Sequence, residues 1–338
     1  MEASRAIDNL TEFDDIFFDR RYAELYADDV NRPGQFVYRD GCDEFVLSYI
    51  KKPIPGTRFY DFETAYGYSG PVSNTLDREF IKAACKSLYK HCENEMMVAG
   101  FIRFNPIIEN HKFVDPQIVD VIKEKKVVVL DLDNVTKEQV RSKYRDDNKN
   151  KIRRAVKSNI KVITESGISS IDAFKGIYYR TMDRANADRF YYFSDTFFLK
   201  FDPLLNGNYN VLLAYAGSEL VGGAIILFKG KILTYFLSAT TDFGRECGAA
   251  NALRDYAVEF AFDKGIKVIN YGGGRTRQND DSLLKFKLGF TDRTADYFIG
   301  KLLINRNEYD KICENWARSV NELVIKRVGN MLLKYRYS

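Results

Sequence analysis

The chain has 338 residues, of which 45% are hydrophobic and 29% are charged, a composition typical of a folded protein of about two domains. Its formal net charge of +4 excludes a uniformly basic protein that coats DNA. Two histidines and five scattered cysteines without a CxxC pair exclude a His-rich metal site and a disulfide framework. We therefore expect no metal, and free thiols in a reducing compartment.

The ends and the apolar runs of the chain bear on its location. The first residues, MEASRAIDNLTEFDD, are acidic and polar, which is not the pattern of a signal peptide. No apolar run approaches the length of about 18 residues that a transmembrane helix needs. The sequence predicts a cytoplasmic protein without a membrane span.

The first part of the chain is expected to form strands around one long helix. Asp40-Gly41 separates two β-rich runs, which is a hairpin signal. A helix is expected to begin near Asp77, because apolar residues follow it at helical spacing. The expected elements are short helices within 11–28, strands at 35–39, 44–50 and 58–62, a helix at 77–93, and strands at 96–104 and 127–132.

The second part begins with one long helix at 134–157, capped by Asn134 or Thr136. A meander of three strands follows further on, and Gly272-Gly273-Gly274 is expected to end a later strand. The expected elements after the long helix are a strand at 160–164, helices at 171–186 and 194–201, strands at 209–216, 219–228 and 231–238, a helix at 248–264, a strand at 266–271, a helix at 281–288, a strand at 293–304 and a helix at 307–327.

The order of elements predicts an α+β fold with a domain boundary near residue 140. The two expected domains are residues 1–140 and residues 141–338, the second including the C-terminal helix. Each is expected to be a mostly antiparallel mixed sheet flanked by helices.

Residues 141–161 concentrate the positive charge of the chain. They hold nine Lys or Arg and two Asp, a local charge of +7, so the rest of the chain sums to about −3. One interpretation is a solvated helix face with Ile152, Ala155 and Val156 packed beneath it. The other is a contact with phosphates, from tRNA or from a nucleotide-linked acceptor. Only Tyr144 interrupts the charges, so stacking on single-stranded nucleic acid is not indicated.

Two short motifs point to chemistry. Arg245-Glu246-Cys247-Gly248-Ala249-Ala250 stands where a strand meets a helix and resembles the pyrophosphate loop, R/Q-x-x-G-x-G/A, of the GNAT acyltransferases. Small residues let backbone N–H groups approach an anion at a helix N-terminus, although the same residues also suit close packing of the helix against a strand. Further on, Gly272-Gly273-Gly274 leaves backbone exposed beside Arg275, and Phe286 lies between Lys285 and Lys287, of which one lysine is expected to point inward.

Together these segments resemble the FemABX-related acyltransferases, a branch of the GNAT superfamily. The resemblance runs from about residue 20 to 304 and rests on segments that are specific in combination. They are FYDFETAYGYSGP (59–71), FIRFNPIIENH (101–111), NKNKIRRAVKSNIKV (148–162) and YGGGRT with DSLLKFKLGF (271–290). Ala65, Ser69 and Asn105 depart from the family's usual Pro, Gly and His, and a long coiled-coil insertion of some members is missing.

The resemblance implies two GNAT-like lobes and N-acyl transfer onto an amine of a cell-envelope precursor, an amino sugar or a peptidoglycan peptide. It implies that Phe286 and Lys287 lie at the reaction centre, where Lys287 stabilises an oxyanion and Arg275 assists. Arg245, Gly248, Ala249 and Ala250 would bind acyl-CoA. Gly272, Gly273, Gly274, Arg189 and Tyr192 would bind the acceptor, although Tyr191 and Tyr192 also suit aromatic packing.

Three alternatives stay open at this point. The donor is expected to be acyl-CoA, and the alternative is aminoacyl-tRNA, as in the peptidoglycan members of the family. The general base is not distinguished among Asp242, Asp280 and Asp281, and His111 suits polar surface better. A protein of another class, which binds a nucleotide-sugar or a partner without catalysis, would also fit.

Overall fold

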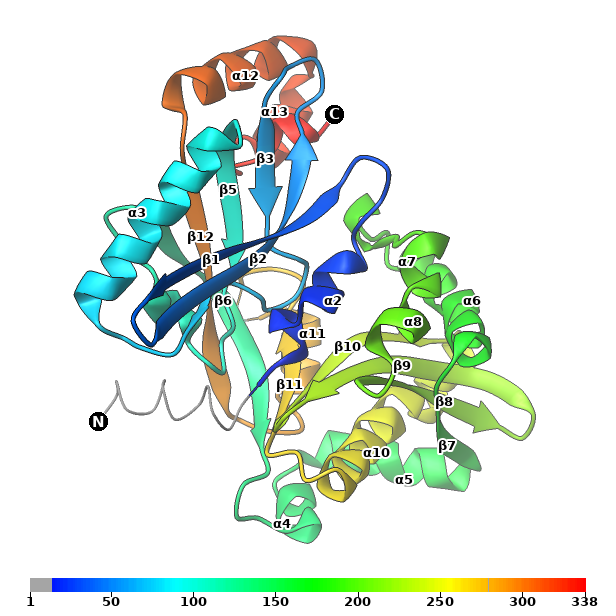
Figure 1. Cartoon of the computed structure of the whole chain (residues 1–338). Helices are drawn as coiled ribbons and strands as arrows, with labels where there is room; N and C mark the ends of the chain where they lie inside the picture. Colours follow the sequence, from blue (N-terminus) through cyan, green and yellow to red (C-terminus); the bar gives the residue numbers. More distant parts are fainter. Residues whose placement is uncertain (1–13, 279) are drawn as a thin grey trace. The chain divides into compact units, whose positions relative to one another are not determined.

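The computed structural model describes residues 14–278 and 280–338. The chain divides into two compact units. Unit 1 comprises Phe17–Glu124 and Tyr297–Ser338, and unit 2 comprises Lys125–Asp296 together with the described residues of Glu12–Ile16. Figure 1 shows the elements of each unit along the chain. The predictions that concern residues 1–13, including the first part of the short helices expected within 11–28, lie outside the described residues.

Unit 1 is a mixed sheet in the order β1-β2-β3-β5-β12, with β4 paired to β2. All neighbours in this order are antiparallel except β3 and β5, which are parallel. Its strands are β1 (Arg32–Asp40), β2 (Asp43–Pro53), β3 (Tyr60–Glu63), β4 (Val72–Ser73), β5 (Met97–Arg103) and β12 (Thr294–Leu303). Its helices are η1 (Ile16–Phe18), α2 (Arg20–Glu24), α3 (Arg78–Asn94), η2 (Asn110–Phe113), α12 (Arg306–Ser319), α13 (Glu322–Val328) and η4 (Lys334–Arg336).

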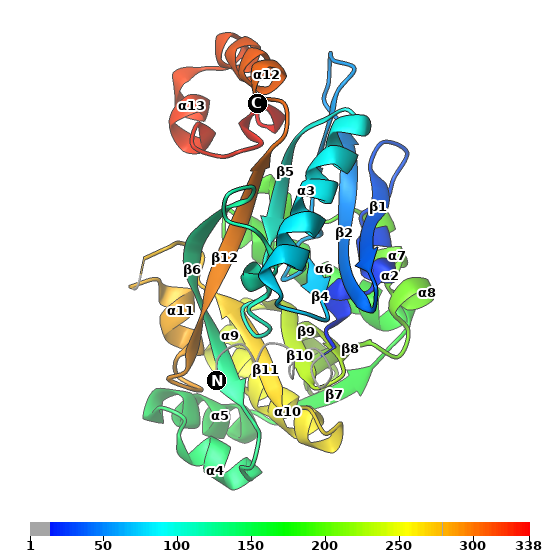
Figure 2. The same cartoon turned by 60° about the vertical axis from the view of Figure 1, so that its left-hand side comes forward.

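The hairpin and the long helix of unit 1 form for the reasons seen in the sequence. Gly41 turns between β1 and β2 with φ of 59°, a backbone conformation that glycine adopts without strain. The Asp77 side chain accepts a hydrogen bond from the backbone N–H of Phe80 and caps α3. The apolar face of α3 is buried, and Figure 2 shows the helix lying along the sheet.

Unit 2 has the sheet order β6-β11-β10-β9-β8-β7, antiparallel except for the parallel pair β10 and β11. Its strands are β6 (Asp120–Asp131), β7 (Ile160–Glu165), β8 (Tyr209–Ala216), β9 (Glu219–Lys229), β10 (Ile232–Thr240) and β11 (Val268–Gly273). Its helices are α4 (Lys137–Ser142), α5 (Asp146–Lys157), α6 (Ile168–Arg184), η3 (Arg189–Tyr191), α7 (Asp195–Leu199), α8 (Phe201–Leu205), α9 (Asp242–Cys247), α10 (Ala249–Asp263) and α11 (Ser282–Lys287).

Helices cover both faces of the sheet in unit 2. On β9, a side chain at Gly222 would meet Leu253 of α10, and one at Gly223 would meet Phe174 of α6. Since neighbouring residues of a strand point to opposite faces, α6 and α10 lie on opposite sides of the sheet (Figure 1). The core between the sheet and α10 is continuous with Tyr144, Tyr235, Tyr271 and Phe290.

The structure confirms the expected α+β class, because each unit is a mostly antiparallel mixed sheet flanked by helices. Its division of the chain differs from the two contiguous domains expected, 1–140 and 141–338. The boundary between the two units lies between Glu124 and Lys125, and the residues from Tyr297 onward belong to unit 1 again. The reason is packing at long range, since β12 pairs with β5, and Tyr309 and Ile312 of α12 join the core of unit 1.

Three expected elements differ in detail. The long helix at 134–157 is two helices, because Lys143 ends α4 and α5 begins at Asp146. The helix at 307–327 is likewise divided into α12 and α13. The three glycines do not end β11 at once, because the strand continues through Gly273 after a bulge next to Gly272.

Candidate functional site

The parallel strands β10 and β11 pair over three residues and then separate. The register runs from Ile232 opposite Val268 to Thr234 opposite Asn270. Tyr235 and Tyr271 directly follow the last pair, and both are buried. Their ring centroids are 6.0 Å apart. The ladder between these two parallel strands therefore ends at the two tyrosines, and open α/β sheets commonly bind ligands at the carboxyl ends of their strands.

Arg254 of α10 lies beside these tyrosines. Its guanidinium carbon is 4.5 Å from the Tyr235 ring centroid and 4.6 Å from the Phe286 ring centroid. Its side chain donates to the carbonyl oxygen of Ala250 at 3.2 Å, and the residue is only 3% exposed. Among the described residues, its Nε finds no hydrogen-bond partner. Two aromatic faces therefore hold a buried cation, and each desolvated contact of this kind contributes about 2 kcal/mol.

Lys287 is the second buried cationic side chain of this cluster. Its Nζ donates to the carbonyl oxygen of Gly273 at 2.7 Å, and the residue is 8% exposed. Lys125 of β6 donates to the next carbonyl, that of Gly274, at 3.1 Å. Burial holds the pKa of Lys287 well below its usual range, and the charges of Arg254 and Lys125 lower this pKa further. We call Arg254, Lys287, Lys125, Gly273 and Gly274 the lysine cluster.

Asp281 connects the glycine run to the helix that carries Lys287. One carboxylate oxygen accepts from the backbone N–H of Leu284 at 2.9 Å and caps α11. The other accepts from the N–H groups of Arg275 and Thr276, at 3.0 Å each. Burial acts to raise the pKa of Asp281, but these donors hold the pKa below its usual range. A carboxylate with this many fixed donors positions the loop, and suits the role of general base poorly.

The structure brings together two of the three residues predicted to be catalytic. Lys287 is a member of the lysine cluster through its contact with Gly273, and Phe286 contacts the cluster through Arg254. Arg275 is exposed, and its backbone N–H is held by Asp281. Lys285 is exposed while Lys287 is buried, as expected for two lysines two residues apart on a helix.

The loop predicted to bind acyl-CoA is packed against α5. Gly248 has φ of 85°, and a side chain there would clash with the backbone carbonyl of Lys151. Ala249 is fully buried, and Ala250 supplies its carbonyl to Arg254. The side chain of Arg245 is 63% exposed. Close packing of α5 thus accounts for the small residues of this loop without an anion.

Arg245 lies on the surface of unit 2, as do Arg189 and Tyr192, two of the five residues predicted to bind the acceptor. Arg245 pairs with Asp242 at 3.2 Å, and Asp242 also takes part in a second ion pair. The Tyr192 hydroxyl donates to Asp183 at 2.8 Å, and its ring stacks on Tyr179. Arg189 is exposed on η3. In the described chain, the side chain of Tyr192 therefore contacts α6 and not the lysine cluster.

The basic helix α5 offers an open cationic face. Four of its basic residues are exposed: Lys151, Arg153, Arg154 and Lys157. Ala155 is buried beneath them as predicted, but Val156 is 69% exposed and not packed, because it lies on the outer side of the helix. Arg141 of α4 is committed to a bidentate pair with Asp255, with both distances 2.9 Å.

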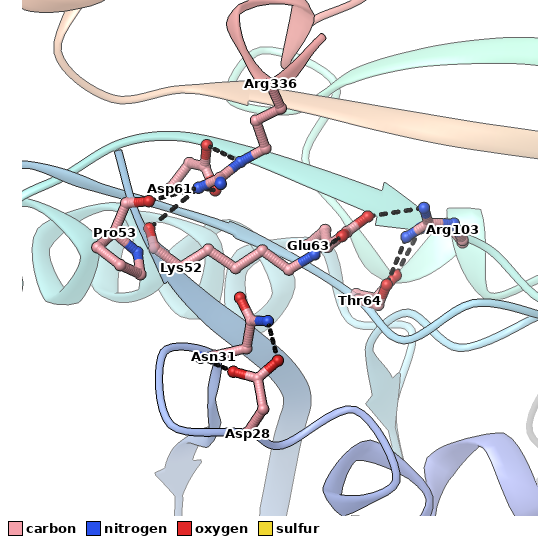
Figure 3. A network of polar contacts seen from close by, with 9 residues as sticks. All are labelled: Asp28, Asn31, Lys52, Pro53, Asp61, Glu63, Thr64, Arg103 and Arg336. Atoms are coloured by element: carbon pink, nitrogen blue, oxygen red, sulfur yellow. Dashed lines mark hydrogen bonds and ion pairs between the residues drawn. The ribbon is translucent and has the colours of Figure 1, made fainter. Parts of the chain in front are cut away.

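The motif at 59–71 builds a polar network inside unit 1 (Figure 3). Asp61 is fully buried and receives two hydrogen bonds from Arg336, at 2.8 and 2.6 Å. Glu63 pairs with Lys52 and with Arg103, the latter at 2.7 Å. The acids of this motif therefore fix β3 to its neighbours and to the C-terminal segment.

Two other residues of the resembling segments also have structural roles. Asn105, in place of the family's usual His, is buried and accepts from the backbone N–H groups of Ile107 and Ile108. His111 stacks on Phe298, with ring centroids 4.0 Å apart. Turn formation therefore accounts for Asn105, and aromatic packing accounts for His111.

Sequence reasoning missed Arg254 and Lys125. Arg254 does carry a signal, because it stands on the same helical face as the buried Ala257, Val258 and Ala261, where an apolar residue is expected. Lys125 carries none, since it lies in a run of lysines and acids. Its place beside Gly274 follows from the pairing of β6 with β11.

No protein-family model matches the sequence, and no curated protein matches it in sequence. The structure superposes on that of FemX with a TM-score of 0.70 at 13% identity, over 92% of this chain and 97% of FemX. The chain has the fold of FemX. The resemblance to FemABX-related acyltransferases expected from the motifs is thus confirmed at the level of the fold.

Two further solved structures share this fold. L-PGS from Bacillus licheniformis matches with a TM-score of 0.59 and 12% identity, over 84% of this chain and 87% of that one. The C-terminal domain of a putative lysylphosphatidylglycerol synthetase from Agrobacterium fabrum matches with a TM-score of 0.57 and 11% identity, over 91% and 92%. Within residues 14–278 and 280–338, no helix is long and apolar enough to cross a membrane.

Proposed function

We propose that the protein is a transferase that moves an aminoacyl group onto an amine of a cell-envelope precursor, with the reaction centre at Lys287. The lysine cluster supports this proposal most directly. It places a buried amine and a buried guanidinium beside the glycine backbone that follows the paired part of β10 and β11. Polar groups fixed in advance in a buried site are the main means of accelerating acyl transfer.

The fold supports the class of reaction. FemX shares the fold over nearly its whole length, and the motifs that resemble the FemABX-related enzymes include the segment that holds Phe286 and Lys287. A putative lysylphosphatidylglycerol synthetase, whose name describes an aminoacylated membrane lipid, has the same fold. An envelope precursor is therefore the acceptor we propose, as an amino sugar or a peptidoglycan peptide.

Aminoacyl-tRNA is the donor we place ahead of acyl-CoA. The case for acyl-CoA rested on Arg245 and the loop that follows it. Packing against Lys151 accounts for Gly248, and Arg245 is paired on the surface. The exposed basic face of α5 would suit an RNA backbone, where each phosphate neutralised adds to affinity and to its dependence on salt. Such a donor would be used in the cytoplasm.

A donor screen tests the proposal. The protein is mixed with an amine acceptor and either charged tRNAs or acyl-CoAs, and the mass of the acceptor is followed. We expect transfer from charged tRNA, with KM rising when Arg153 and Arg154 are both changed to Glu. Arg245→Ala is the matched control on the other motif and is expected to leave KM unchanged.

The competing results are distinct. Transfer from acyl-CoA that is lost in Arg245→Ala would replace the proposed donor. Binding of a nucleotide-sugar without transfer from any donor would instead support the non-catalytic alternative. A loss of turnover in Lys287→Met is expected in either enzymatic case.

A further inference from the structure

Arg254 and Lys287 are buried basic side chains, and among the described residues neither forms an ion pair with an acid. Arg254 is 3% exposed and Lys287 is 8% exposed. In the described chain, Arg254 donates to the carbonyl of Ala250, and Lys287 donates to that of Gly273. Burying a charge in this way is costly unless an opposite charge is paired with it. Only one member of such a pair can lose its charge, since arginine stays protonated in proteins while lysine does not.

The groups that face Lys287 come from three elements. Arg254 of α10 and Lys125 of β6 add positive charge, and Asp281 at the start of α11 adds negative charge. The carboxylate of Asp281 is already committed to backbone donors of its own loop and helix. Burial and the two cations favour the loss of a proton from Lys287, and together they outweigh the opposing charge of Asp281, whose carboxylate is engaged elsewhere.

We infer that Arg254 keeps Lys287 uncharged, and that the uncharged Nζ of Lys287 takes the proton from the attacking amine during transfer. Arg254 is a positioning residue in this scheme, fixed between the rings of Tyr235 and Phe286. The catalytic part of the inference rests on the proposed function. It assigns a base other than the three candidate acids, because Asp242 and Asp281 are held in other contacts and Asp280 is exposed.

The step balances without a further reactant. The nitrogen of the acceptor bonds to the carbonyl carbon of the donor, and its proton passes to Nζ of Lys287. The bond between that carbon and the donor oxygen then breaks, and Nζ returns the proton to the leaving oxygen. A base whose pKa lies near the working pH serves both halves of this exchange best.

The charge of Lys287 can be measured without turnover. The whole protein is labelled with 13C at the lysine ε-carbons, and the signals are followed over pH by NMR. Lys287 is assigned by its loss in Lys287→Arg, and the exposed Lys285 is the reference on the same helix. We expect Lys287 to lose its proton at lower pH than Lys285, and to move towards Lys285 in Arg254→Met, which keeps an apolar stem between the rings.

Titration of Lys287 together with Lys285 in the unaltered protein would overturn the inference, whether or not Arg254→Met folds. An unchanged midpoint in a folded Arg254→Met would overturn the role of Arg254. Circular dichroism establishes whether that variant is folded.

Turnover separates this inference from the proposed function. Lys287→Arg introduces a permanent positive charge that cannot accept a proton, and we expect it to lose about 100-fold or more in kcat. Lys285→Arg is expected to keep full turnover. In Arg254→Met, the fall of kcat on the acid side is expected to move to higher pH. If Lys287→Arg stays active, the base is wrong while the transferase stands; if Lys287 is uncharged but no donor reacts, the proposed function fails.

Discussion

Removing Arg336 should destabilise unit 1 strongly, because the partner it leaves behind is fully buried. Asp61 is 0% exposed and accepts both of its ionic hydrogen bonds from Arg336. Arg336 also donates to the backbone carbonyls of Lys52 and Pro53, at 3.2 Å each (Figure 3). Breaking a buried ion pair from one side typically costs about 3–5 kcal/mol.

The assay is thermal and chemical unfolding of Arg336→Met at pH 7, with Arg318→Met as the control. Arg318 lies in the same C-terminal segment, but its side chain is 77% exposed and reaches Glu314 only at 3.9 Å. For a unit of this size, about 4 kcal/mol corresponds to a fall in Tm of roughly 10 °C, whereas the control is expected to change stability by less than about 0.5 kcal/mol.

The dependence on pH and on a second substitution identifies the cause. Burial already raises the pKa of Asp61 despite the pairing with Arg336. Without Arg336 the folded protein favours the neutral acid more strongly, so the loss of stability should shrink as pH falls. Asp61→Asn combined with Arg336→Met should recover part of the loss. A loss below about 1 kcal/mol, or one that is the same at pH 5 and pH 8, would refute the reasoning.

Four other substitutions have defined outcomes. Gly248→Ala, which meets both a positive φ and the backbone of α5, should cost about 2–4 kcal/mol in chemical unfolding, while Gly176→Ala in the open middle of α6 should stabilise by about 0.5–1 kcal/mol. Asp281→Ala should cost about 1–2 kcal/mol and speed hydrogen exchange at the two loop amides that its carboxylate holds. Burial acts to raise the pKa of Glu63, but its two cations lower it to about 2 from 4.5. Its contribution of about 3 kcal/mol is thus fully present above pH 4.5 and lost towards pH 2, so the stability difference between the wild type and Glu63→Gln should vanish over that interval of acid unfolding.

Local signals in the sequence predicted elements well. The Asp77 cap, the Asp40-Gly41 turn and the meander of β8, β9 and β10 each depend on residues close together in the chain, and each forms as expected. The exposed Lys285 and buried Lys287 also follow from helical geometry alone. These features are decided by backbone preference and by the spacing of apolar residues.

Contacts at long range could not be predicted in the same way. The lysine cluster joins β6, α10 and α11 through the pairing of β6 with β11. The pair of Asp61 with Arg336 joins residues 275 positions apart. No turn residue or periodicity indicates such a partner, so Arg336 could not be placed beside β3 from local patterns. The loop at Arg245 shows that a local pattern can have two interpretations, because a short motif typical of anion binding also fits close packing of helices.

The way the chain enters and leaves unit 2 has a consequence for synthesis on the ribosome. Lys125–Asp296 is one continuous stretch, whereas unit 1 needs β12 and the packing of Tyr309 and Leu332 against β5 to complete its core. Domains generally fold as their residues emerge. Unit 2 should therefore reach its native state before β12 is available to pair with β5. Until then, the edge of β5 that pairs with β12 is the part of the nascent chain most accessible to chaperones and proteases.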